Sequence, residues 1–575
     1  SWYERHPELY PLDISPLPGP DLDPRVPLHR DSYRYATRPE GLAEGDAFPE
    51  FFGGQWGSVA KFLGLDFIHL RDGFFGPLLY TRCGPYGTVA SADPAENRTW
   101  TDAVRRLFRA CKESHPDGLV IAYSSGISGT AEWMTGCVDL EEIVADGALD
   151  MFIDQTWGGA WQDWWDDTWK GWTFQLAYLL GHGAQIAAGN ARRKSDPCRH
   201  YLLIETWDGW EPWDTLRDTP EKLRWAMWAF THATVVGAGG RLLRRDGAYI
   251  SWMNDWNDRL IGEKEVVFLA TNLNAAETSA ASLEAVYGPL LVHNRGALLA
   301  KSESNPASNA SEWVEDYAGM AMKWGLPVLA ATTIEWMPRY WPEGVVVQLA
   351  GEIDAHRLAD LGGPVLSTGR ADLVDASLLK KAGVMRTQEM VKGGYTLGHA
   401  GGEERVHMPE RVTVAAAAGS WVGYRAGGTP TLVGRDDFLY WQPPDLADPT
   451  DALVPHSQIG TVSPYVEAAR AMLARSAAAG GVSVEQVPAA QPIAFQCWKS
   501  GGRVHVLLGN LESGWMGDSR YARRVKVSLP RKRLGLDENK RYALEGAAAD
   551  ASDEVLRFAV EVPPQGCFHG VLVEA

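Results

Sequence analysis

The sequence has little of what marks metal-binding, membrane or nucleic-acid-binding proteins. Its six cysteines are far apart and form no C-x-x-C pair, which argues against a zinc ribbon or a dense disulfide framework. No apolar run approaches the ~18 residues of a membrane helix, so we expect a soluble protein. Acidic residues outnumber basic ones by 73 to 54, and a net charge of −19 repels phosphate backbones and anionic lipid. Neither nucleic acid nor a membrane is therefore an expected partner.

Several catalytic motifs are also missing. There is no G-x-S-x-G elbow and no H-E-x-x-H helix, which removes the main support for an esterase or a zinc protease. The stretch GAGGRL at 237–242 falls short of the G-x-G-x-x-G fingerprint of dinucleotide sites. We therefore expect neither a metal nor an organic cofactor.

Tryptophan, in contrast, is abundant. Thirteen of the 25 tryptophans lie between Trp157 and Trp256, and several follow Asp or Gly in segments that are typical of loops. Flat rings stack on the C–H faces of sugars, while neighbouring carboxylates bind the hydroxyl groups. Part of this cluster therefore predicts a carbohydrate-binding cleft, and the rest belongs to the core.

The length of 575 residues predicts more than one domain, because single cores rarely grow beyond ~300 residues. After a Pro-rich lead-in of about 50 residues, helix-like stretches alternate with short apolar strands as far as residue 262. Continuous apolar strands between helices indicate a parallel sheet covered on both faces. We predict an α/β fold for residues 1–262, a (β/α)8-type barrel that carries the catalytic site.

Two further domains are predicted. Residues 263–400 contain the apolar segments GPLLVHN, GLPVLAA, GVVVQLA and GPVLST with helices between them, which favours a flavodoxin-like α/β sheet. Residues 401–575 alternate mainly with period two, as in ERVHM and VLRFAVEV, which favours a β-sandwich.

Carboxylates follow the strands of the predicted barrel, where functional residues stand. Asp72 follows FIHL, Asp154 follows MFI, and Glu205 follows LLI. Glycoside hydrolysis needs such a set, with one group to protonate the leaving oxygen and one to attack or to activate water. Structural roles are also open, because Asp72 could pair with Arg71 and Asp154 could cap a helix. The loop after Glu205 holds further candidate carboxylates, which are Asp208, Glu211 and Asp214.

This order of parts resembles glycoside hydrolase family 42 and its relatives, which combine a barrel, a flavodoxin-like domain and a small C-terminal β-domain. The segment 201–240, which begins YLLIETWDGWEPW, is similar to that group's strand-seven segment and implies a nucleophilic Glu205. LDMFIDQTW is similar to its strand-six segment and implies a substrate-binding Asp154. The group's middle domain often mediates trimerisation, which implies a homo-oligomer, with a trimer favoured.

The chain also departs from that family. After strand four the family has Asn-Glu, with Glu as the acid/base, whereas this chain has Arg71-Asp72, so the role passes to a side chain one methylene shorter. Strands one to three are not recognisable before Leu65. Specificity for β-galactosides is therefore not implied.

Together these features predict a retaining glycosidase that acts on an oligo- or polysaccharide, with Glu205 as nucleophile and Asp72 as acid/base ~5 to 5.5 Å away. The predicted sugar-contacting residues are Trp157, Trp161, Trp207 and Trp210, which would stack on rings, and Arg71, His69 and Asp154, which would hold hydroxyl groups.

Other interpretations remain open. An α-glycosidase would use Asp72 as nucleophile and Asp154 as acid. A non-catalytic protein would bind carbohydrate on a degenerate barrel. An amidotransferase-like role for the middle domain lacks a cysteine at a strand-to-helix elbow.

Overall fold

The computed structural model describes residues 48–70, 94–123, 139–156, 172–206, 215–251, 261–297, 314–349, 356–358, 360–399, 402–426, 428–442, 462–487, 493–510, 522–551 and 554–575. The chain divides into two compact units. The first comprises Ser1–Gln155, Gln185–Tyr201 and Lys301–Ala310, and the second comprises Thr156–Ala184, Leu202–Ala300 and Ser311–Ala575. Among the described helices, none is long and apolar enough to cross a membrane.

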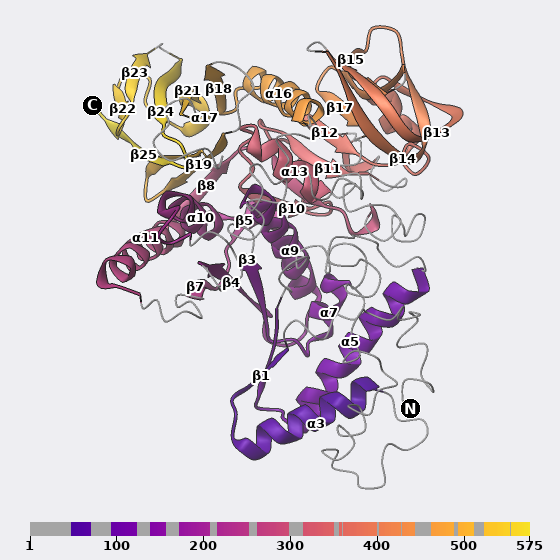
Figure 1. Cartoon of the computed structure of the whole chain (residues 1–575), viewed down its shortest axis with the longest axis vertical. Coiled ribbons are helices and arrows are strands. Elements are labelled where there is room, and N and C mark those ends of the chain that lie inside the picture. The colour runs from indigo at the N-terminus through magenta and orange to yellow at the C-terminus, as the bar shows by residue number, and fades with distance from the viewer. Residues whose placement is uncertain are drawn as a thin grey trace. The chain divides into compact units, whose positions relative to one another are not determined.

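The first unit contains a parallel sheet in which helices precede the strands (Figure 1). Its elements are α3 (Phe48–Leu63), β1 (Phe67–Leu70), α5 (Pro94–Ser114), β2 (Leu119–Tyr123), α7 (Leu140–Asp146), β3 (Met151–Thr156), the end of α9 (Trp172–Arg192) and the start of β4 (Arg199–Glu205). β1 pairs in parallel with β2 and β2 with β3. The Arg199 amide donates to the Asp150 carbonyl at 2.8 Å, which begins β4 beside β3. The predicted mixed α/β fold with a parallel sheet is confirmed, while the closed barrel stays a prediction.

Local sequence explains the helices of this unit. In α7 the Asp139 carboxylate caps the first turn by accepting from the Glu142 amide at 3.1 Å, and Gly147 ends the helix at a φ of 98°. In α5 the buried residues Val104, Leu107, Phe108 and Cys111 form one helical face. These features hold each helix at a fixed position before its strand.

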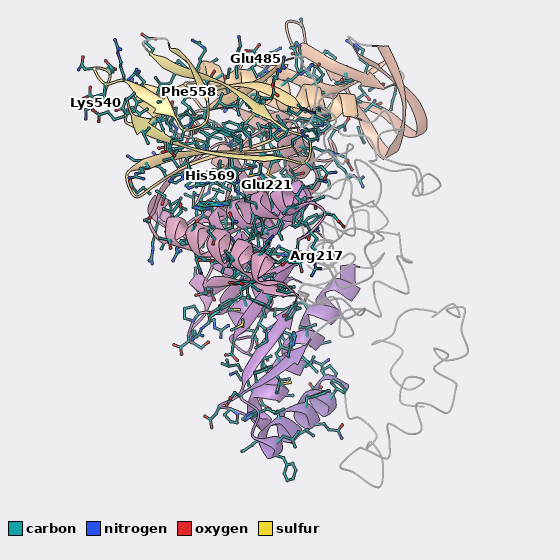
Figure 2. The ribbon with its side chains drawn as sticks, turned by 60° about the vertical axis from the view of Figure 1, so that its left-hand side comes forward. Arg217, Glu221, Glu485, Lys540, Phe558 and His569 are labelled. Carbon is teal, nitrogen blue, oxygen red and sulfur yellow. The ribbon has the colours of Figure 1, made fainter. Side chains whose placement is uncertain are left out.

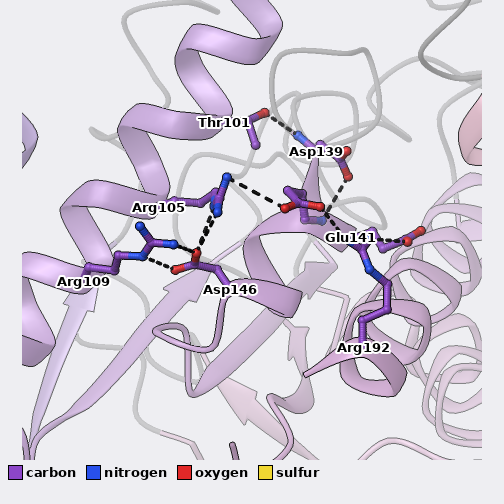
Figure 3. A network of polar contacts seen from close by, with 8 residues as sticks. Thr101, Arg105, Arg109, Asp139, Glu141, Asp146 and Arg192 are labelled. Atoms are coloured by element: carbon purple, nitrogen blue, oxygen red, sulfur yellow. Dashed lines mark hydrogen bonds and ion pairs between the residues drawn. The ribbon is translucent and has the colours of Figure 1, made fainter. Parts of the chain in front are cut away.

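Ion pairs join the helices α5, α7 and α9 (Figure 3). The carboxylate of Asp146, at the end of α7, accepts from Arg105 Nε at 3.0 Å and from Arg109 Nε at 2.8 Å, both on α5. Its hydrogen bond raises the pKa of the Arg109 guanidinium. From α9, Arg192 donates to Glu142 at 2.6 Å. The helices that precede β2, β3 and β4 are thereby tied to one another.

The second unit contains a mixed sheet, in the order β14-β13-β15-β16-β17-β12-β11-β9-β10-β5-β6. Its strands are β5 (Thr234–Val236), β6 (Leu242–Leu243), β9 (Leu290–His293), β10 (Ala330–Thr333), β11 (Val345–Gln348), β12 (Val365–Thr368), β13 (Val384–His399), β14 (Gly402–Ala416), β15 (Trp421–Ala426), β16 (Thr429–Arg435) and β17 (Phe438–Trp441). The strands β10, β9, β11, β12 and β17 are parallel neighbours. If these five strands are numbered 1 to 5 along the chain, their order across the sheet is 2-1-3-4-5, which is the order of flavodoxin-like sheets.

Six strands of this sheet come from outside residues 263–400, the range that the sequence assigned to it: β5 and β6 precede that range, and β14 to β17 follow it. β5 pairs in parallel with β10, with Thr234 opposite Ala330. β14, whose alternating pattern resembles a sandwich strand, forms a long hairpin with β13. In this hairpin Val384 pairs with Ala416 at the open end, and His399 pairs with Gly402 at the closed end. Alternation defines the faces of a strand but does not identify its partner. The domain boundaries at 262/263 and 400/401 stay predictions.

A β-sandwich forms from two further antiparallel sheets of the second unit, in the orders β18-β21-β24-β23 and β22-β25-β20-β19-β8. Their strands are β8 (Leu283–Tyr287), β18 (Ser483–Val487), β19 (Ala494–Ser500), β20 (Arg503–Gly509), β21 (Arg523–Pro530), β22 (Tyr542–Leu544), β23 (Ala548–Ala551), β24 (Val555–Val562) and β25 (Cys567–Glu574). Alternate residues of β24, such as Phe558 and Val560, meet Phe495 and Val506 in one core.

The remaining described elements of this unit are helices and one strand, β7 (Gly247–Ser251), which is the neighbour of β4. The helices are α10 (Pro220–His232), α11 (Glu263–Ala281), α13 (Val314–Lys323), α15 (Ala376–Lys381), α16 (Val462–Ala478), α17 (Arg531–Leu534) and the short 3-10 helix η4 (Ala238–Gly240).

Candidate active site

The strands β1, β2 and β3 of the first unit end at Leu70, Tyr123 and Thr156. Parallel strands present their carboxyl ends at one edge of a sheet, and this edge is where α/β proteins bind ligands. The residues near these ends are therefore the ones to compare with the predicted site.

His69 lies on β1, one residue before the end of the strand, and is exposed. Its ring centroid is 4.3 Å from that of Tyr123, the last residue of β2. The pairing of β1 with β2 sets His69 opposite Ile121, so Tyr123 lies one position further along the same face. Tyr123 was not among the predicted site residues, although it is the last residue of the apolar segment LVIAY. An imidazole and a phenol therefore lie together at this edge.

Asp154 lies within β3 and is 3% exposed, so it does not cap a helix. Its Oδ2 is 2.5 Å from Nε2 of His200, which lies near the start of β4 and is also buried. The ring of Phe152, two residues earlier on β3, is 6.3 Å from the His200 ring. A buried carboxylate is costly unless it is hydrogen-bonded, and the imidazole supplies such a partner.

His200 was missed by the sequence analysis. Its only signal is a histidine in the otherwise apolar segment HYLLI, and this pattern more often marks a core histidine than a functional one. The partner 46 residues away in the sequence becomes visible only when β3 and β4 are adjacent.

Glu205 is the last residue of β4, directly after the buried Leu203 and Ile204. Its backbone therefore has the position at the carboxyl end of a strand that the sequence predicted. The other predicted residues lie outside the described ones, and their roles stay predictions. They are Asp72, Arg71, Trp157, Trp161, Trp207 and Trp210, and the same holds for Asp208, Glu211 and Asp214.

In the described part of the chain, no group of three or more His, Cys, Asp or Glu residues could hold a metal ion. At the described strand ends, the imidazole of His69 and the phenol of Tyr123 lie on one face of the sheet. The carboxylate of Asp154 lies on the other face, because Tyr123 pairs with Ile153. These groups can accept and donate hydrogen bonds and can move protons.

Solved structures show what this fold is similar to. A β-galactosidase from Bacillus circulans sp. alkalophilus superimposes with a TM-score of 0.51 at 11% identity, over 96% of this chain and 87% of that one. The fold resembles that of family 42 β-galactosidases, as the sequence indicated. One of these, from G. stearothermophilus, has a TM-score of 0.47 at 10% identity, over 83% of this chain and 68% of that one. An exo-β-1,4-mannosidase from Opitutaceae bacterium strain TAV5 has a TM-score of 0.45 at 12% identity, over 74% and 76%.

By sequence, the chain matches no family model and no curated protein. At such low identities the structural likeness shows the fold, and the residues carry the argument for function.

Proposed function

We propose that this protein is a glycoside hydrolase that cleaves glycosidic bonds of an oligo- or polysaccharide. The observation that carries the proposal is the buried Asp154–His200 pair near the carboxyl end of β3. Separately, Glu205 is the last residue of β4. Carboxylates at the ends of parallel strands are the groups that glycoside hydrolysis requires. The similar fold of a β-galactosidase supports the same class of reaction.

In the proposed retaining mechanism, Glu205 attacks the anomeric carbon as Asp72 gives its proton to the leaving oxygen. A glycosyl ester of Glu205 forms and the glycosidic bond breaks. Asp72, now a carboxylate, then takes a proton from water, which attacks the ester and releases the sugar with its original configuration.

The substrate contacts proposed from the sequence remain part of this function. Trp157, Trp161, Trp207 and Trp210 would stack on sugar rings, and Arg71 and His69 would bind hydroxyl groups. Tyr123, whose ring lies against His69, joins this set. A homo-oligomer, with a trimer favoured, is proposed from the family resemblance.

Asp154 is proposed to orient a substrate hydroxyl, with His200 as its positioning residue. The 2.5 Å contact between Oδ2 and Nε2 fixes one carboxylate oxygen of Asp154 against the imidazole. A general acid has to carry a proton to the leaving oxygen instead. The pair therefore favours a binding role for Asp154 over the acid role that the α-glycosidase alternative gives it.

Replacement of His200 by Phe is expected to lower kcat/KM by roughly 10- to 100-fold, because small misplacements of a positioned group have effects of this size. His200→Asn, which keeps an N–H donor, should recover part of the loss. In an Asp154→Asn background, His200→Phe should cause no further loss, since the two residues act as one unit. The control is His115→Phe, at a half-buried histidine of the same unit whose ring contacts the Leu65 carbonyl instead of a carboxylate. Full activity of His200→Phe would remove this role.

Replacement of Asp72 by Ala separates the two catalytic assignments. If Asp72 is the acid/base, 4-nitrophenyl glycosides should still be cleaved, because a good leaving group needs little protonation, and azide should give a glycosyl azide of retained configuration. If Asp72 is the nucleophile, every substrate should fail and azide should give the inverted product. We expect the first result.

The function itself is tested by product analysis with a panel of 4-nitrophenyl glycosides and polysaccharides. Hydrolysis with retained configuration supports the proposal. Sugar binding without hydrolysis, unchanged when Glu205, Asp72 and Asp154 are all replaced by their amides, would establish the non-catalytic alternative.

A further inference from the structure

The sandwich sheet β22-β25-β20-β19-β8 presents one face to the sandwich core and the other to the helices α10 and α11. On the helix side, Trp225 Nε1 of α10 donates to Gln496 Oε1 of β19 at 2.9 Å. A Cβ on Gly509 of β20 would lie 2.7 Å from Cδ1 of Trp225, so the helix approaches the strand closely. All of these elements belong to the second unit.

Five aromatic rings fill this contact, and we call them the histidine–tryptophan joint. They are Trp228 and His232 of α10, Trp498 of β19, His505 of β20 and His569 of β25. Figure 2 labels His569 and, on α10, Glu221. Ring centroids are 4.1 Å apart for Trp228 and His569 and 4.2 Å apart for His232 and Trp498. The His505 ring stacks on Trp498 at 5.2 Å with an interplanar angle of 7°.

The hydrogen bonds of His232 fit the neutral ring. Nδ1 lies 2.8 Å from the Trp228 carbonyl oxygen, which can only accept, so Nδ1 carries the proton. Nε2 lies 2.8 Å from Ser279 Oγ of α11 and can accept from that hydroxyl. Trp498 Nε1 donates to the same Oγ at 3.4 Å. The neutral ring with its proton on Nδ1 therefore satisfies both contacts.

His505 and His569 share one proton. Nδ1 of His505 lies 3.1 Å from Nε2 of His569, so one nitrogen donates and the other accepts. Two protonated rings could not make this bond and would repel each other. The pair can therefore keep this bond with at most one of its two rings protonated.

The charged groups near the joint are four arginines and one carboxylate. Arg224 of α10 pairs with Glu221 at 3.0 Å, and the other three are Arg244 and Arg245 after β6 and Arg503 of β20. From α11 and β19 the facing groups are Ser279, Trp498 and Ser500, and from β25 the thiol of Cys567 lies two residues from His569. In the described residues, no carboxylate bonds to any of the three imidazoles.

We propose that the histidine–tryptophan joint is an acid-operated contact, which opens on mild acidification and releases the outer face of the sandwich from α10 and α11. The closed joint packs three imidazoles against tryptophans and beside arginines, where a protonated ring is disfavoured, whereas the opened joint exposes them to water, where they can be protonated. Acid thus favours the open form without any change in the sandwich core.

The direction follows from the pKa values of the three rings. Burial lowers the pKa of His232 to about 3 and that of His569 to about 3, and it lowers the pKa of His505 to about 4; nearby positive charge acts in the same direction. Because these values lie below the ordinary 6.5, the closed joint has its full stability above pH 6.5 and loses it as the pH falls towards 4. Opening takes up one proton per ring, so its equilibrium constant should rise several hundred-fold, roughly 500-fold, between pH 6 and pH 5.

Hydrogen exchange of the full chain tests the proposal. Exchange is followed at pH 7, 6, 5.5 and 5 in the segments 221–232 and 567–574, corrected for the intrinsic pH dependence, with segments 345–348 and 365–368 of the parallel sheet as internal controls. We expect the opening equilibrium constant of the two joint segments to rise roughly 500-fold between pH 6 and pH 5, and that of the control segments to change much less. A dependence below about tenfold between pH 6 and pH 5 in the wild type would overturn the proposal.

The double variant His505→Phe/His569→Phe identifies the groups responsible. It keeps the stacked shape and removes both partners of one hydrogen bond, so neither is left unpaired. With one titrating ring left, the rise between pH 6 and pH 5 should fall to ~8-fold. His356→Phe, which removes an exposed histidine elsewhere in the unit, should behave as the wild type. If the double variant keeps the wild-type dependence, the joint is not the sensor.

Discussion

Replacement of Glu205 by Gln is expected to lower kcat by about four orders of magnitude or more, because the amide cannot form the glycosyl ester. Glutamine has the same shape as glutamate, so β4 should end as before and the protein should fold. The rate on the best aryl glycoside of the panel, measured with circular dichroism on the same sample, checks both points.

The sequence between β4 and α10 contains a second glutamate, which offers a matched control. Glu211→Gln removes a carboxylate six positions further along the chain and should leave kcat within about threefold of the wild type, as is usual for a carboxylate outside the mechanism. If Glu205→Gln turns over at the wild-type rate, Glu205 has no part in the reaction. If Glu211→Gln is inactive instead, the nucleophile is in the loop and not at the end of the strand.

Replacement of Arg533 by Met is expected to destabilise the second unit by about 3–5 kcal/mol. Glu343, in the segment between β10 and β11, is 0% exposed, and Arg533 of α17 binds it with Nε–Oε1 2.8 Å and Nη2–Oε2 3.0 Å. The guanidinium also lies 4.9 Å from the ring centroid of Tyr287 and 5.5 Å from that of Trp341. Methionine fills similar space but leaves the carboxylate buried without its partner.

Urea unfolding measures this effect, with Arg524→Met as the matched control. Arg524 donates to Glu561 at 2.8 Å, but both side chains are exposed, and surface pairs contribute less than about 1 kcal/mol. The double variant Arg533→Met/Glu343→Gln should recover part of the loss, because the amide has no charge to bury. Equal effects of Arg533→Met and Arg524→Met would contradict the argument.

Much of the strand content was predictable from the sequence. LDFIHL, GLVIAY and LDMFI became β1, β2 and β3, and GVVVQLA became β11, because apolar runs bounded by Gly and Asp specify buried parallel strands. Partners were not predictable. β14 alternates like a sandwich strand yet pairs with β13, and β5 joins β10 from a segment almost 100 residues earlier. Local periodicity contains no information about which strand lies beside which.

In the candidate site, too, residues that depend on one strand were predictable and residues that depend on strand pairing were not. The strand ends located Asp154 and Glu205, because the residue after an apolar run can be read directly. His200 could not be found, since its role depends on the pairing of β4 with β3 and not on its neighbours in the sequence. Tyr123 was missed for a similar reason, because its contact with His69 crosses from β1 to β2.

The pairing of β8 with β19 has a consequence for the order in which the protein can be assembled during synthesis. β8 precedes the whole flavodoxin-like part of the mixed sheet, yet Tyr287 pairs with Cys497, 210 residues later. Every strand from β9 to β17 emerges from the ribosome while β8 is still without its partner. The parallel strands can therefore pack first, and the sandwich can close only when β19, β20 and β25 have been made. Until then β8 offers an open strand edge, so it can pair with another chain throughout the synthesis of the strands from β9 to β17.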